Sequence, residues 1–282
     1  MRRTFAKIFK KRTHFLSDMV NSKDIADLRS AELHPIAASY QSAKNYFLIN
    51  VDPLYVRGWF GIPFCNHPFV DTVKELMLNS DLSYEHSALS IYHQNYQPAN
   101  AAERCGLWSS CSLLTKYPPY SAVLPWFRSS PAQRKIRFEE NYKDQNIRRG
   151  KDLPLEAGFG GYGPTSYEKG SLEVSALRNV LRSIQKHGYR PCPTKDGHIS
   201  AYMLVHDDQS IRYLIRSGHH RTSVLCALGY SYFPLLLSST NIVRRSDFAH
   251  WPMVRAGFFS INEALRVFDS VFEGRRPYKD VS

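Results

Sequence analysis

Three nitrogen-rich side chains follow a glycine in the stretch SGHHRTSVLCALG, which spans residues 217–229. An apolar run leads into the glycine and a helix-like segment leaves it, so the pattern predicts a turn between a strand and a helix. The first turn of a helix presents unpaired backbone N–H groups and the positive end of the helix dipole, which together attract anions. Arginine adds a forked donor that suits phosphate, and histidine can exchange a proton near neutral pH. The predicted phosphate-binding residues are Gly218, His219, His220, Arg221 and Thr222.

Proton transfer at this turn would need a base, and both histidines are candidates for that role. Two carboxylates, Glu168 and Glu173, precede or open the helical segment upstream of the turn. A glutamate near a helix N-terminus is also an ordinary partner of the helix dipole, and we favour that interpretation for Glu173. The predicted catalytic residues are therefore Glu168, His219 and His220. The alternative is structural: one histidine packs in the core with its hydrogen bonds satisfied, and the other is solvated.

Helical and strand patterns alternate around the turn. Residues 171–187 place aliphatic side chains on one helical face, with Ser171 as the predicted N-cap and Gly188 as the stop. A capping box from Ser260 to Glu263 predicts the last helix of the chain. The expected strands of this half are 198–205, 211–215 and 232–237. These elements predict an α+β fold, in which a small mixed sheet is packed against helices.

The order of these elements resembles the ParB/sulfiredoxin superfamily over roughly residues 158–240. The segment SIQKHGYRP at 183–191 is similar to the helix end of that superfamily. Two strands follow, and the segment GHHR at 218–221 then resembles the G-x-[HR]-R turn that opens an alanine-rich helix. The resemblance implies that this turn cradles nucleotide phosphates.

Three departures separate the chain from branches of this superfamily. Sulfiredoxins carry a cysteine directly before His-Arg, where this chain has His219, so sulfur chemistry of that type is not expected. ParB partition proteins continue with a DNA-binding domain and a dimerisation domain, and residues 239–282 are too few for both, so no specific DNA site is expected. The branch that phosphorylates free serine has an aspartate before the turn glycine, where this chain has Ser217.

Composition divides the rest of the chain into further segments. Residues 1–20 form a basic amphipathic segment, which could contact an anionic membrane surface peripherally or dock on the core as a terminal helix. Residues 21–127 are expected to form an N-terminal extension that is helical and rich in aromatic side chains. Residues 128–157 are basic and polar and are the predicted linker. The ParB/sulfiredoxin-like domain with its C-terminal helix would then cover residues 158–282.

Cysteine usage and hydropathy predict a cytoplasmic protein without a metal site. The basic segment 1–20 could hold this protein at the inner face of the membrane. The five cysteines are odd in number and lack the CxxC and Cys/His spacings of zinc ligands, so we expect reduced thiols. No apolar run approaches the roughly 20 residues that a membrane-spanning helix needs. The net charge of +12 attracts polyanions of any kind and does not say which.

Three functional hypotheses follow from these observations. The first is a nucleotide-binding phosphotransferase or NTPase that acts on a small molecule, with ATP, ADP or CTP and Mg²⁺ as its cofactors. The second is a non-catalytic module that binds a ligand or a partner and that could act at the membrane surface. The third is a DNA-binding ParB-like protein, which the short C-terminal segment disfavours.

Overall fold

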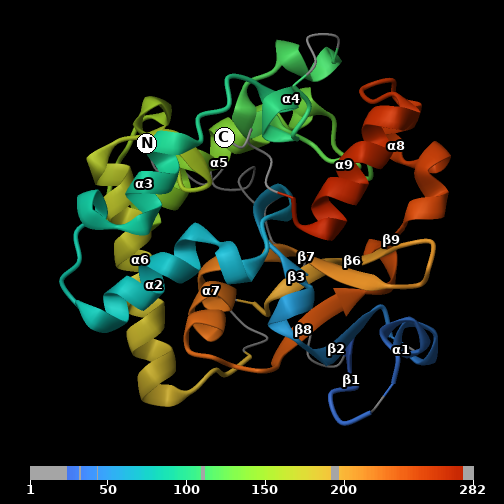
Figure 1. The fold of residues 1–282 in the computed structure, drawn as a ribbon, viewed down its shortest axis with the longest axis horizontal. Helices are drawn as coiled ribbons and strands as arrows, with labels where there is room; N and C mark the ends of the chain where they lie inside the picture. Colours follow the sequence, from blue (N-terminus) through green and yellow to red (C-terminus); the bar gives the residue numbers. More distant parts are fainter. Residues whose placement is uncertain (1–23, 32, 43, 109–111, 192–196, 276–282) are drawn as a thin grey trace, which may run out of the picture.

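The computed structural model describes residues 24–275, apart from residues 32, 43, 109–111 and 192–196. The predicted amphipathic segment 1–20 lies outside the described residues. The described chain forms a mixed sheet with helices packed on both of its faces, which confirms the predicted α+β class (Figure 1). Within these residues no helix is both long enough and apolar enough to cross a bilayer.

The main sheet has the strand order β1-β2-β8-β6-β7-β3, and β9 pairs with β6 beside this path. Neighbours β2 and β8 are antiparallel, as are β6 and β7, whereas β3 runs parallel to β7 and β9 runs parallel to β6. A separate antiparallel pair is formed by β4 and β5. The strands are β1 (Ile25–Asp27), β2 (Tyr46–Val51), β3 (Val56–Arg57), β4 (Gly158–Phe159), β5 (Tyr162–Thr165), β6 (Ser200–Val205), β7 (Ile211–Ser217), β8 (Phe233–Ser238) and β9 (Ile242–Arg244).

The helices that flank the sheet come from the whole length of the described chain. They are α1 (Pro35–Gln41), α2 (Pro68–Leu78), α3 (Ala88–Asn95), α4 (Ala101–Arg104), α5 (Pro131–Arg148), α6 (Tyr167–His187), α7 (His219–Ala227), α8 (Pro252–Arg255) and α9 (Ile261–Glu273). Short 3₁₀ turns lie between several of them, including Trp59–Gly61 and Pro119–Ser121. Helix α9 begins at the predicted capping box, because Ser260 and Glu263 each accept a hydrogen bond from the other's backbone N–H.

Alternation along the strands separates two hydrophobic cores on the two faces of the sheet. Met203 and Tyr213 belong to the core that packs against α2, α6 and α7. Their neighbours Leu204 and Leu214 belong to a second core, which includes the apolar face of α9. Figure 1 shows the same division, with α2, α6 and α7 on one side of the sheet and α8 and α9 on the other. A period of two is what a sheet buried on both faces requires.

Much of the predicted linker, residues 128–157, forms the helix α5. Ser130 caps this helix, and a capping box with Gln133 and a proline at its first position fix where it begins. The segment is polar because most of α5 faces solvent, not because it is irregular. Residues on both sides of this segment also contribute to the first core, since Phe47 and Val56 pack in the same cluster as Leu177.

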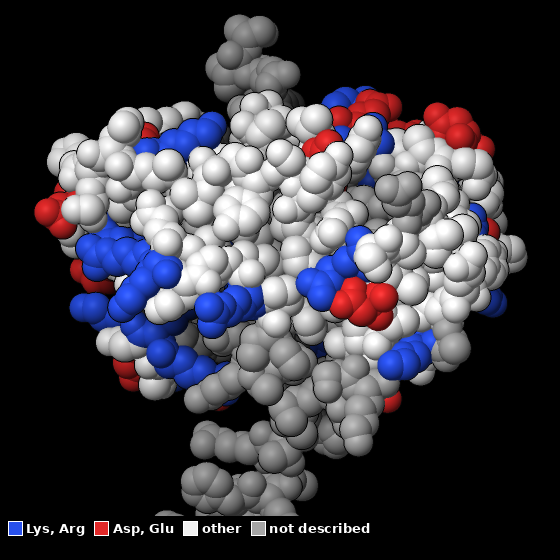
Figure 2. Space-filling view, turned by 90° about the horizontal axis from the view of Figure 1, so that it is seen from below, with Lys and Arg blue, Asp and Glu red and all other residues white. Residues whose placement is uncertain are grey.

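Basic side chains are concentrated on part of the molecular surface. Figure 2 shows lysine and arginine gathered towards one side of the face seen from below, on the side where Figure 1 shows α2 and α6. Acidic side chains lie mainly around the rim of this face. Part of the net charge of +12 is therefore concentrated in one basic patch. Such a patch attracts polyanions over a distance that shortens as the ionic strength rises.

Candidate functional site

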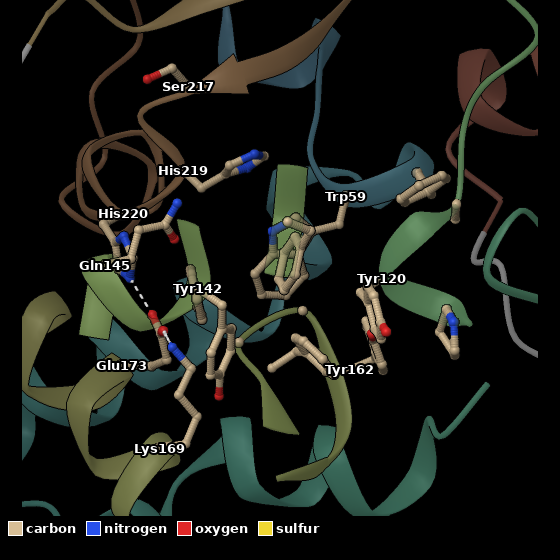
Figure 3. A pocket seen from close by; sticks show the side chains of 18 of the residues that line it. Trp59, Tyr120, Tyr142, Gln145, Tyr162, Lys169, Glu173, Ser217, His219 and His220 are labelled. Carbon is tan, nitrogen blue, oxygen red and sulfur yellow. Dashed lines mark hydrogen bonds and ion pairs between the residues drawn. The ribbon is translucent and has the colours of Figure 1, made fainter. Parts of the chain in front are cut away.

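The predicted turn faces a cavity of about 780 Å³ (Figure 3). This volume falls within the range of roughly 300–1,000 Å³ that is usual for small-molecule sites. Its walls come from α5, the start of α6, the start of α7, the β4–β5 hairpin and the 3₁₀ turns at Trp59–Gly61 and Pro119–Ser121. The site is therefore assembled from segments that lie far apart in the sequence.

Gly218 makes the turn from β7 into α7. It is the N-cap of α7 and has a left-handed backbone with φ of 93°, a conformation that glycine adopts without strain. A Cβ atom at this position would also lie 3.0 Å from the side chain of Ile199. No side chain caps the helix, so the N–H groups of its first turn are not covered by a capping oxygen.

The structure brings four of the five predicted phosphate-binding residues to the cavity. Gly218, His219, His220 and Arg221 all contribute to its lining. Thr222 is buried instead, and its hydroxyl donates to the carbonyl of Gly218 at 3.1 Å. Thr222 therefore has a structural contact in the helix and is not among the lining residues.

Glu168 is not among the residues that line this cavity, and its catalytic role stays a prediction. It is exposed in the first turn of α6, away from the cavity lining. The helix begins at Tyr167 with Ser166 as its N-cap, which is five residues earlier than Ser171, the predicted cap. This earlier start places Glu173 in the second turn, where it points into the cavity (Figure 3).

Glu173 is the acidic centre of the site. Its carboxylate is buried, and its Oε1 atom accepts from Lys169 Nζ at 2.9 Å and from Arg149 Nη1 at 2.7 Å. Its Oε2 atom lies 2.9 Å from Nε2 of His220. Asn146 accepts a further hydrogen bond from Lys169 Nζ at 3.0 Å. From the sequence Glu173 is expected to be a partner of the helix dipole, because two of its three partners, Arg149 and His220, come from other segments and leave no local signal.

The charged partners of Glu173 keep it ionised. Burial by itself would raise the pKa of Glu173, but the hydrogen bond from His220 and the charges of His220, Arg149 and Lys169 outweigh burial and hold that pKa well below its usual range. An ionised carboxylate can only accept, so Nε2 of His220 is the donor in this pair, and in the neutral tautomer of the ring Nδ1 would be the acceptor. The ring of His220 is held further by stacking on Phe69 at 4.8 Å.

The two histidines of the turn differ in environment. Burial lowers the pKa of His219 to about 3, and the nearby charges of His220 and Arg104 make a smaller contribution in the same direction. His219 is therefore neutral at physiological pH, and its ring lies 6.1 Å from that of Trp59. His220 instead has a carboxylate partner. The structure thus separates one histidine with a charged partner from one that stays uncharged.

Arg221 combines a place in the cavity lining with a structural contact. Its Nη1 atom donates to the carbonyl of Gly197, in the segment that leads into β6. The other terminal nitrogen, Nη2, would lie 3.4 Å from a Cβ atom on Gly218, so the guanidinium stays beside the turn. One side of the fork therefore anchors the loop, and its charge remains next to the helix N-terminus.

Helix α5 supplies part of the site that the sequence did not reveal. Its lining residues recur at intervals of three or four, which is one face of a helix. Phe138 and Tyr142, four residues apart, were the available signal within a segment that otherwise looked like a linker. The lining residues of this helix are Arg134, Phe138, Tyr142 and Gln145, and Arg149 follows as its C-cap.

The cavity is rich in cations and in aromatic rings. Among its described lining residues, five side chains carry a positive charge and Glu173 is the single carboxylate. The cationic residues are Arg104, Arg134, Arg149, Lys169 and Arg221. The aromatic residues are Trp59, Phe60, Phe69, Tyr120, Phe138, Tyr142, Phe159 and Tyr162. Such a lining suits a ligand that has negative charge and a flat apolar part.

No group of three or more histidine, cysteine or acidic side chains within the described chain is arranged to hold a metal ion. Magnesium prefers carboxylate and phosphate oxygens, and the one carboxylate of the lining already accepts from three nitrogen groups. These residues therefore do not fit a magnesium ion held by the protein itself.

The chain matches no protein-family model, no curated protein and no solved structure. The resemblance to the ParB/sulfiredoxin superfamily thus rests on the order of its motifs alone.

Proposed function

We propose that the cavity binds a nucleotide, with its phosphates at the N-terminus of α7 and its base among the aromatic rings. The observation that carries this proposal is the composition of the lining, in which five cations and eight aromatic rings surround one fully engaged carboxylate. The uncapped first turn of α7 adds N–H groups that favour a bound phosphate. The resemblance of GHHR to the nucleotide-binding turn of the ParB/sulfiredoxin superfamily supports the same reading.

The aromatic part of the cavity suits a base. Trp59, Tyr142 and Phe159 all line it, and Trp59 stacks at 6.0 Å on Tyr92 behind the wall. Stacking on an aromatic side chain is worth about 1–3 kcal/mol for each base and depends little on which base it is. The lining therefore favours nucleotides as a class without selecting adenine or cytosine.

The proposed chemistry is phosphoryl transfer to a small molecule or to water. His220, oriented by Glu173, would accept on Nδ1 the proton of the attacking hydroxyl. The attacking oxygen would bond to the terminal phosphorus as the bond from that phosphorus to the bridging oxygen breaks, and the shortened nucleotide would leave. Arg221 and the N–H groups of α7 would offset the charge that develops on the phosphoryl oxygens. Because the lining does not fit a protein-held magnesium ion, charge neutralisation is assigned here to the protein's own cations.

A second candidate function is binding without catalysis. It is favoured by the saturation of Glu173, whose oxygens accept from Lys169, Arg149 and His220. A carboxylate held in this way is a poor proton acceptor, so catalysis would depend on His220 alone. Turnover separates the two candidates, whereas ligand affinity does not.

A thermal-shift titration with ATP, ADP and CTP, with and without Mg²⁺, tests the binding proposal. At a nucleotide concentration about 100-fold above the dissociation constant, stabilisation of about 2.7 kcal/mol is expected. For a chain of this size that corresponds to a rise in melting temperature of about 5–10 °C. Adenosine lacks the phosphates and is expected to give a much smaller rise.

A nucleotide is expected to stabilise the protein without Mg²⁺ as well, because the cationic side chains of the cavity neutralise the charge of its phosphates. An equal shift with adenosine and ATP, or no shift with any of the three nucleotides, would contradict the proposal. Release of inorganic phosphate or transfer to an added alcohol, followed by ³¹P NMR, then decides between catalysis and binding alone.

A further inference from the structure

One of the five cations of the lining, Arg104, is deeply buried in the wall of the cavity and makes no contact with Glu173. Arg104 is the last residue of α4, and only 4% of its surface is exposed. Three aromatic rings surround its guanidinium carbon, with their centroids 4.7–5.3 Å away: Tyr162, Phe60 and Tyr96. The rings cover the faces of the guanidinium, so its N–H groups can donate only in the plane of the fork.

The positive charge of Arg104 has no acidic partner in the described part of the chain. No described carboxylate lies within salt-bridge distance of it, and the adjacent Glu103 accepts instead from the backbone of Ala99 and the side chain of Asn100. The Nη1 atom of Arg104 is buried and has no hydrogen-bond partner among the described residues. Burial raises the pKa of Tyr96 and Tyr162, so both stay neutral. The Tyr96 hydroxyl hydrogen-bonds the guanidinium of Arg104 but brings no negative charge to balance it.

An unpaired buried charge is strongly unfavourable, and an anionic ligand would compensate it. The cavity gives Arg104 access to such a ligand. Its Nη2 atom would lie 2.8 Å from a Cβ atom on Gly161, so the glycine leaves room beside the guanidinium. The hydroxyl of Tyr162, in the same wall, is also buried without a hydrogen-bond partner in the described chain.

Arg134 adds a second positive charge from α5. It lines the same cavity, and its Nε atom is buried with no hydrogen-bond partner in the part of the chain that is described. The side chain stacks on Phe127 at 5.2 Å. Burial raises the pKa of the Cys105 thiol, and the charges of Arg104 and Arg134 both oppose that rise. The two guanidinium groups therefore lie near the same residue.

We propose that Arg104, with Arg134, binds a second anionic group of the ligand. The cavity would then take a molecule with phosphate at the α7 end and another oxyanion, a carboxylate or a phosphate, at the Arg104 end. The planar fork of Arg104 suits either group, since both accept two parallel N–H donors. This inference rests on the proposed function for the phosphate at α7 and narrows the nucleotide to one that carries a second anionic group away from that phosphate.

Equilibrium dialysis against inorganic phosphate tests the two subsites separately. The wild-type protein is expected to bind two phosphate ions. Arg104→Met, which removes the charge and keeps similar bulk, is expected to lose one of them, and Arg221→Ala is expected to weaken the other. Arg212→Met is the matched control, because Arg212 also stacks on aromatic rings, Tyr55 and Phe272, but does not line the cavity.

The outcomes distinguish this inference from the proposed function. If Arg104→Met binds phosphate as the wild type does, the second subsite is refuted while the α7 site stands. If Arg104→Met loses a phosphate and Arg221→Ala loses none, the second subsite stands and the phosphate site at α7 fails. Two ions bound by Arg212→Met support the assignment, whereas loss of one there contradicts it. A wild type that binds no phosphate refutes both.

Folding of the variants gives an independent readout. Without phosphate, Arg104→Met is expected to melt no lower than the wild type, because the variant removes an unpaired buried charge. A purely structural Arg104, held by its rings, predicts a lower melting temperature for that variant. Arg104→Lys keeps the charge but loses the fork, and it is expected to bind the second phosphate about ten-fold more weakly. If Arg104→Met does not fold, wild-type affinity in Arg104→Lys refutes the inference.

Acetate identifies the kind of group that Arg104 prefers. Acetate that displaces only the phosphate sensitive to Arg104→Met assigns a carboxylate to this end of the ligand. If the phosphate at Arg104 stays bound in excess acetate, the group at this end of the ligand is a second phosphate. If acetate displaces only the phosphate whose binding depends on Arg221, the assignment of the two ends is refuted.

Discussion

Replacing Glu173 by glutamine tests whether this buried carboxylate holds the site together. The change keeps the shape of the side chain and removes the charge that Lys169, Arg149 and His220 share. The side chain of Lys169 is 8% exposed, so its ammonium group would stay buried without a counter-charge. The side chain of Arg149 is 36% exposed and can regain water, so Lys169 carries most of the cost.

Breaking a buried ion pair by removing one partner costs about 3–5 kcal/mol of unfolding free energy. We expect the lower end, about 3 kcal/mol, because Asn146 still accepts from Lys169. For a chain of this size that lowers the melting temperature by about 6–12 °C.

The loss depends on pH with a defined sign. The pKa of Glu173 is depressed in the folded state, so its stabilisation is complete above the unfolded pKa of about 4.3 and is lost as the pH falls through the folded value. The wild type and Glu173→Gln should therefore differ most near pH 7 and converge in acid.

Thermal unfolding followed by circular dichroism at pH 7 and at lower pH measures this difference. The control is Glu168→Gln, in the same helix, because Glu168 is exposed and its removal should change the unfolding free energy by less than about 0.5 kcal/mol. If Glu173→Gln melts with the wild type and the control, the ion-pair cluster does not hold the site, and our reasoning about it is refuted.

Three further predictions concern the turn, the packing of α6 and the N-terminus. Arg221→Ala should weaken nucleotide binding by about 10–100-fold, the value of a charge-assisted hydrogen bond, and Arg221→Lys should restore only part of it. Unchanged affinity with a lower melting temperature in Arg221→Ala would instead assign Arg221 a purely structural role through Gly197. Gly170→Ala should destabilise by about 1–3 kcal/mol in chemical denaturation, since a Cβ atom there would lie 2.4 Å from the ring of Tyr84, and wild-type stability would contradict this packing. Removal of residues 1–20 should abolish binding to anionic liposomes with the melting temperature unchanged, and equal binding of both forms would exclude a membrane role for this segment.

Local patterns in the sequence predicted elements where the determinants are local. Helix α9 begins at its capping box, and the strand–glycine–helix order around Gly218 is present as predicted. Ser171 is the predicted N-cap of α6, but the helix begins earlier and Ser166 holds the cap. Short-range signals thus located the turn around Gly218, whereas the start of α6 required the packed structure.

The components of the site that the sequence could not predict depend on distant contacts. Glu173 differs from Glu168 through Arg149 and His220, which lie in α5's C-cap and in α7. Arg104 looks like a solvent-facing residue of a short helix, and it is buried only because rings from three other segments surround it. Composition alone could not assign these charges to the interior, since arginine is rarely buried without a partner.

Amide hydrogen exchange with and without ATP tests the central claim most directly, because it reports both whether the nucleotide binds and where. Our account predicts slower exchange at the first turn of α7, residues 219–222, and along α5, whose side chains line the same cavity. Adenosine at the same concentration should leave α7 unchanged. Slower exchange confined to other segments, or no change at any saturating concentration of ATP, would contradict a nucleotide site in this cavity.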